Sequence, residues 1–147
     1  MPLRDRSSRE ELQAAILNTF GGPPDEVRDG GESLPGVYIL WCPPSEAASE
    51  VAQSIAGKIG NKLQKVLQAA QGNGLLYIGQ SKHVPRRVWN HTQNRGADVT
   101  RAVLPHKLVA VNWQAPDIGL RNLEDMVGRQ VVESVETSGY DLVVDWG

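Results

Sequence analysis

Apolar residues recur at helical intervals in three stretches of the chain. In residues 12–20 they follow Ser8 and Glu11, which have the spacing of a capping box, so we expect an amphipathic helix there. In residues 51–70 the apolar positions step by three or four and predict one long helix. Residues 123–131 repeat this period and predict another helix.

Other apolar runs are short and have the composition of strands. Residues 36–41 and 75–79 are rich in β-branched and aromatic side chains and are bounded by proline, glycine or polar residues. Residues 107–114 alternate strictly between two faces, and residues 140–144 form a further short apolar run. The sequence therefore predicts four strands.

Together these elements predict an α/β (α+β) fold in which a small mixed or antiparallel central sheet is flanked by helices. Pro85 suits the first turn of one more helix, which we expect to run through His91 and to end near Gly96. A chain of 147 residues is the size of one domain, so we expect a single domain over residues 1–147. Within it, residues 1–33 would form an N-terminal helix and loop, and residues 45–73 a helical insertion.

Charge is distributed unevenly, although the formal net charge is only -2. Residues 51–107 carry nine basic side chains and one acidic one, whereas the segments on either side are acidic. A local basic region of this kind is a candidate contact for a polyanion, because phosphate groups respond to the nearby field. A solvated surface balanced by acidic neighbours is the alternative interpretation. The basic residues that we nominate for nucleic-acid binding are Lys58, Lys62, Lys65, Lys82, Arg86, Arg95 and Arg101.

Three of these lysines fall in one stripe of the helix expected at residues 51–70. Lys58, Lys62 and Lys65 flank its apolar face at about 100° per residue. We expect this helix to lie on the body of the protein and to follow a DNA backbone, unless the three are ordinary surface lysines.

Cysteine content and hydropathy limit the classes of function. Cys42 is the only cysteine, so an intramolecular disulfide and a multi-cysteine zinc site are excluded, and we expect it to be a buried thiol. No apolar run approaches the ~20 residues that span a bilayer, so we expect no membrane partner and a cytoplasmic location. Trp41, Trp89 and Trp113 are candidates for the core.

Two tripeptides on expected strands resemble the signature of the GIY-YIG nucleases. They are Gly36-Val37-Tyr38 and Tyr77-Ile78-Gly79. In that family an arginine follows eight residues after the second glycine, on a helix, and often a histidine or tyrosine four residues later. Arg87 and His91 have this spacing, and Glu124 occupies the place of the family's glutamate on a later helix.

The resemblance implies a metal-dependent endonuclease with DNA as its substrate. It implies that Tyr38, Tyr77, Arg87, His91 and Glu124 form the catalytic site. Glu124 would hold one Mg²⁺ or Mn²⁺ ion in this scheme, and Arg87 would bind the scissile phosphate.

The chain also departs from the family's pattern at three places. Thirty-eight residues separate Tyr38 from Tyr77, where the family usually has a short hairpin. Gln80 stands where several members carry a lysine or a small residue. Asp141 stands where the family commonly closes the site with an asparagine.

Chemical reasoning from the residues leaves the general base open. Tyrosine has a reference pKa of ~10 and is a poor base unless a metal and Arg87 lower it, so His91 is the alternative to Tyr38. Arg87 and His91 stand four residues apart and share one helix face. Glu124 is a hard oxygen donor of the kind that Mg²⁺ accepts.

Three classes of function are compatible with these patterns. The leading one is the endonuclease, for which a restriction-type homodimer would match a palindromic site by two-fold symmetry. The second is a non-catalytic nucleic-acid-binding module with a GIY-YIG-like fold. The third is a scaffold unrelated to nucleic acid, for which the basic region would be accidental.

Overall fold

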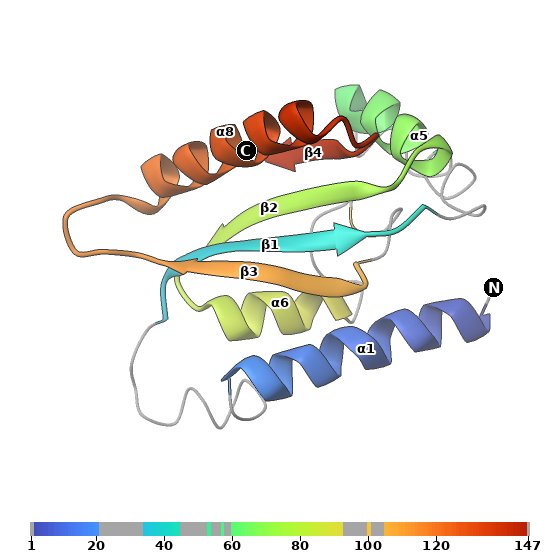
Figure 1. Cartoon of the computed structure of the whole chain (residues 1–147). Helices are drawn as coiled ribbons and strands as arrows, with labels where there is room; N and C mark the ends of the chain where they lie inside the picture. Colours follow the sequence, from blue (N-terminus) through green and yellow to red (C-terminus); the bar gives the residue numbers. More distant parts are fainter. Residues whose placement is uncertain are drawn as a thin grey trace.

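The computed structural model describes residues 2–20, 34–44, 60–92 and 105–146, together with residues 53, 57 and 100. The described strands form one four-stranded sheet. Helices lie on both sides of this sheet (Figure 1). The elements, in chain order, are α1 (Pro2–Phe20), β1 (Gly36–Cys42), the 3-10 turn η1 (Gly60–Lys62), α5 (Leu63–Gln71), β2 (Leu75–Ser81), α6 (Val84–Thr92), β3 (Lys107–Trp113), α8 (Leu120–Ser138) and β4 (Val143–Trp146).

The sheet is mixed and has the order β3-β1-β2-β4. β1 pairs with both β2 and β3 in antiparallel fashion, and β2 pairs with β4 in parallel. The expected fold class is therefore confirmed. The two strands that carry the tripeptides are direct neighbours even though the insertion separates them in the sequence.

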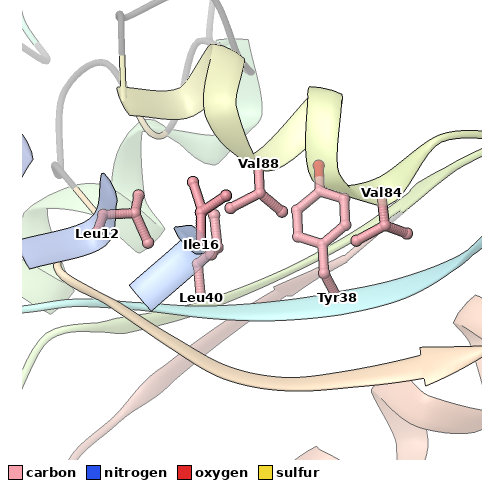
Figure 2. Packing of buried hydrophobic residues seen from close by; sticks show 6 residues of the cluster. All are labelled: Leu12, Ile16, Tyr38, Leu40, Val84 and Val88. Atoms are coloured by element: carbon pink, nitrogen blue, oxygen red, sulfur yellow. The ribbon is translucent and has the colours of Figure 1, made fainter. Parts of the chain in front are cut away.

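Alternation along β1 supplies a core on each face of the sheet. Tyr38 and Leu40 face α1 and α6, where Figure 2 shows the Tyr38 ring rising from β1 toward α6 between Val84 and Val88. Val37 and Ile39 face the other way and pack with Val127 of α8. The helices thus form two layers around the sheet, α1 with α6 and α8 opposite (Figure 1).

The insertion packs against β4. Val66 and Ala69 of α5 are buried with Leu75 and Val143, and this cluster also contains the buried thiol Cys42, as expected. The expectation of one continuous helix over residues 51–70 is wrong at Gly60, whose φ of 56° is left-handed and incompatible with an α-helix. Most of residues 45–59, including Lys58, lie outside the described residues.

Strict alternation along β3 is also a wrong expectation. The pairing with β1 shifts register between Ile39 and Leu40, so that Leu40 faces Leu108 while Ile39 faces Ala110. Val109 is the extra residue of this bulge and is exposed. Because of the bulge, Leu108 and Val111 both reach the core beneath α1 and α6.

Several boundaries differ from those that the sequence predicts. α1 begins at Pro2, a favourable first helical residue, so Ser8 lies inside the helix and does not cap it. β4 occupies residues 143–146, so it begins three residues later and ends two residues later than expected. Trp89 is half-buried and packs against the core beneath α1 and α6, as expected. Trp41 is also half-buried, but it stacks with His106 and Lys107 and belongs to none of the described core clusters. Trp113 is exposed because β3 is an edge strand. The expected loop over residues 21–33 lies outside the described residues.

None of the described helices combines the length and the apolar character needed to cross a membrane.

Docking of α1 onto the sheet gives a direct test of this arrangement. Leu12 is completely buried against the β1–α6 core, whereas Leu17 on the same helix is 42% exposed. We expect Leu12→Ala to lower the free energy of unfolding by about 2–5 kcal/mol, because it leaves a cavity. The control Leu17→Ala should change it by less than about 0.5 kcal/mol. Urea denaturation measures both values, and equal effects would contradict the docking of α1.

Candidate functional site

A pocket of about 520 Å³ opens where β4 ends beside β2. In the described residues β4 pairs with β2 only as far as Ile78, so the next residues of β2, Gly79 and Gln80, line the pocket instead. Groups from the two faces of the sheet can therefore meet around this edge. The lining residues are Tyr38, Lys62, Tyr77, Ile78, Gly79, Gln80, Arg87, Arg121, Glu124, Asp125 and Trp146.

The pairing of β1 with β2 brings the two tyrosines together. Tyr38 lies opposite Gly79, and Tyr77 lies opposite Leu40, so both phenols project from the same face. Their ring centroids are 6.3 Å apart. A Cβ atom on residue 79 would overlap the Tyr38 hydroxyl and ring, which explains why this position is a glycine.

α6 contributes Arg87 and His91, one turn apart. Arg87 lines the pocket beside both phenols, whereas His91 lies behind Tyr38 and is 2% exposed. His91 Nε2 is 2.9 Å from the Tyr38 hydroxyl, and its Nδ1 is 2.9 Å from Thr100 Oγ1. The five sequence-nominated catalytic residues are thus gathered at one place, but His91 contacts Tyr38 rather than the pocket.

Burial sets the protonation of these groups. Desolvation raises the pKa of Tyr38 well above its usual value, assisted by the nearby Tyr77 and opposed by the Arg87 charge. Desolvation also raises the pKa of Tyr77, again against the influence of Arg87. Burial, with a further contribution from Arg87, lowers the pKa of His91 to about 3. Both phenols are therefore protonated and the imidazole is neutral at pH 7.

α8 places two adjacent carboxylates at the pocket, but they differ in their partners. Asp125 accepts hydrogen bonds from Trp146 Nε1 at 3.2 Å and from Arg129 at 3.4 Å. Glu124 is only 6% exposed and lies close enough to affect both tyrosines electrostatically. Gly128 allows this packing, because a Cβ there would overlap the Trp146 ring.

Glu124 is the side chain of this pocket that is suited to bind a metal ion. Its carboxylate is a hard oxygen donor that faces the pocket, and Mg²⁺ commonly binds to one or two carboxylates with water and substrate phosphates as further ligands. Within the described ranges, no group of three or more histidine, cysteine or acidic side chains has the arrangement of a metal site. A divalent ion here would accordingly need oxygens from water and substrate.

The nominated basic residues do not share one location. Lys62 lines the pocket, but Lys65 does not, and both form ion pairs with Asp145. One carboxylate thus partly neutralises both ammonium groups, and the expected contact of the three-lysine stripe with DNA stays a prediction. Lys82 is exposed and Arg86 half-buried, and neither lines the pocket. Lys58, Arg95 and Arg101 lie outside the described residues.

Two contributions to the site were missed by sequence reasoning. Arg121 lies one helical turn before Glu124 and lines the pocket, and this i, i+3 spacing was the available signal. Asp141, expected to close the site, instead lies at the opposite end of β4, where its side chain meets Gly72. The acidic residue of this segment that approaches the site is Asp145, which pairs with Tyr77 in the sheet and bonds Lys62.

No protein-family model, curated protein or solved structure matches this chain. The resemblance to GIY-YIG nucleases therefore stays a prediction that rests on the residues and their geometry.

Neutral burial of His91 predicts how stability depends on pH. The unfolded chain takes up a proton on this imidazole below its ordinary pKa of 6.5, whereas the folded protein does so only near pH 3. The contribution of His91 to the free energy of unfolding is therefore fully present above pH 6.5 and is lost as the pH falls toward 3. We expect the wild type to lose up to about 1.4 kcal/mol more per pH unit in this window than His91→Gln. Urea denaturation at several pH values measures both slopes, and identical slopes would contradict the neutral burial of His91.

Proposed function

We propose that the chain is a metal-dependent endonuclease of the GIY-YIG type that hydrolyses phosphodiester bonds in DNA. One observation carries the proposal: two tyrosines, an arginine and a buried glutamate from four separate elements line one pocket. Tyr38 belongs to β1, Tyr77 to β2, Arg87 to α6 and Glu124 to α8. These are the residues and the element types that the sequence resemblance nominates.

The charge of the pocket suits a phosphodiester. The planar guanidinium of Arg87 can bind two phosphate oxygens at once. A fixed cation beside a phosphoryl group stabilises the charge that develops in the transition state. Arg121 adds a second guanidinium at the rim.

We assign the contact with the attacking water to Tyr38, because it lines the pocket whereas His91 lies behind it. The neutral imidazole carries one proton. With this proton on Nδ1 and donated to Thr100, Nε2 accepts the hydrogen bond of the Tyr38 hydroxyl. His91 thereby positions the phenol oxygen, whose lone pairs accept the hydrogen bond of the attacking water. The imidazole does not keep a proton at neutral pH, because burial lowers its pKa to about 3. Tyr77 lies beside this pair and orients the water.

Glu124 would hold Mg²⁺ or Mn²⁺ at the pocket, since both oxygens of its neighbour Asp125 are bonded to other side chains. A divalent ion bound there would supply positive charge that lowers the pKa of the phenol and stabilises the phosphate oxygens. Without added positive charge, burial keeps Tyr38 protonated. Proton transfer from Tyr38 therefore has to accompany the binding of substrate and cation.

The proposed DNA substrate has consequences for the oligomeric state and the cellular location. A homodimer would present two such pockets related by two-fold symmetry, as cleavage of both strands of a palindromic site requires. A DNA substrate is also compatible with the cytoplasmic location that the sequence predicts.

Supercoiled plasmid provides the test of this function. We expect the wild type to nick it only when Mg²⁺ or Mn²⁺ is present. Glu124→Gln keeps the shape of the side chain but removes its charge, so nicking should fall by roughly three orders of magnitude while DNA binding persists. The matched control is Glu133→Gln, which changes an exposed glutamate on the same helix and should retain wild-type activity.

Gel electrophoresis of the plasmid and circular dichroism of each variant complete the measurement. Metal-dependent nicking by Glu124→Gln at the wild-type rate would contradict the proposed site. DNA binding by the wild type without any nicking would instead support the non-catalytic binding module.

A further inference from the structure

Two lysines of the insertion share one partner but occupy different surroundings. Lys62 Nζ lies 3.2 Å from Asp145 Oδ2, and Lys65 Nζ lies 3.4 Å from Asp145 Oδ1. Their side chains are similarly accessible, at 35% and 42%. Lys62 nevertheless lines the pocket of the candidate site, and Lys65 does not.

Asp145 is a fixed anchor for both ammonium groups. Its side chain is 1% exposed, and its backbone pairs with Tyr77 in the centre of the β2–β4 ladder. A buried carboxylate with two cationic partners holds them in defined positions, because an uncompensated buried charge is costly. The cluster of Lys62, Lys65 and Asp145 therefore carries a net charge of one positive unit.

The remaining donors of the two lysines point to different roles. An ammonium group has three N–H donors. Lys65 Nζ also donates to the Val144 carbonyl oxygen at 3.3 Å, so it binds the strand itself. The bond to Asp145 occupies one donor of Lys62, and its position at the pocket leaves the others available to a ligand there.

We propose that Lys62 is a phosphate-binding residue of the candidate active site, supplied by the insertion and positioned by Asp145. This inference rests on the proposed function, because the ligand is the DNA phosphodiester. Lys62 binds the phosphate from the β4 side of the pocket, while Arg87 binds it from α6. The insertion thus acts at the reaction centre, and Lys65 fastens α5 to β4.

The test compares Lys62→Gln with Lys65→Gln. Each change removes one ion pair to Asp145, and Lys65→Gln also removes the bond to Val144. Lys65→Gln should therefore lose at least as much stability in thermal unfolding as Lys62→Gln. We expect Lys62→Gln to lower single-turnover plasmid cleavage by roughly tenfold to a hundredfold. It should also reduce the magnitude of the log-affinity against log-salt slope for a short DNA duplex in EDTA by ~0.9, because one phosphate contact is lost. Lys65→Gln should change cleavage by less than about twofold and leave the slope unchanged.

Asp145→Asn separates positioning from charge. It removes the anchor but keeps the Lys62 cation, so cleavage at saturating DNA should fall while affinity for the duplex is kept or increased. A general loss of structure would lower both. If the glutamine variants fail to fold, Lys62→Arg and Lys65→Arg provide a second comparison, because both keep the ion pairs. Only Lys62→Arg should slow cleavage, since a planar guanidinium does not place its charge where the lysine ammonium contacts the phosphate.

Equal effects of the two lysine changes, or no effect of either in an active protein, would overturn the role of Lys62 and leave the proposed function standing. A wild type that neither binds nor nicks DNA would overturn both proposals.

Discussion

The packing of Tyr38 across Gly79 is the constraint on which the site depends. The β1–β2 register sets these residues opposite one another, and the missing side chain at residue 79 makes room for the phenol. The ring then reaches α6, where its hydroxyl meets His91 and Arg87 lies one turn earlier on the same helix. A slip of one residue in this register would turn Tyr38 to the face covered by α8 and disperse the group.

The short fourth strand explains how groups from both faces of the sheet meet. The described part of β4 pairs with β2 only as far as Ile78. Beside this point α8 brings Glu124 and Arg121 to the same pocket that Tyr38, Tyr77 and Arg87 reach from the other face. β4 also carries Asp145, which connects the insertion to this edge through its two lysines. A single strand therefore defines the opening of the pocket and holds the insertion beside it.

The sequence predicts the parts of the molecule that follow local rules. The apolar patterns identify both tripeptide strands and α8, and Pro85 indicates α6. The spacing of Arg87 and His91 correctly places them on one helix face. The structure differs from the prediction where contacts between distant elements determine the conformation. No local pattern reveals that Asp145 pairs with Lys62 and Lys65, residues about 80 positions away. The β3 bulge and the position of His91 behind Tyr38 likewise depend on packing between elements that are distant in the chain.

We propose that this pocket binds a divalent cation and a phosphodiester together. The most direct test is paramagnetic broadening by substoichiometric Mn²⁺ in NMR spectra of the wild type. The sample contains a short DNA duplex whose phosphorothioate linkages make it resistant to cleavage. We expect the amide signals of Tyr77, Arg87 and Glu124 to broaden first, while those of Glu10 and Leu17 on α1 stay sharp. Broadening at exposed carboxylates such as Glu10, with the pocket signals unchanged, would contradict it.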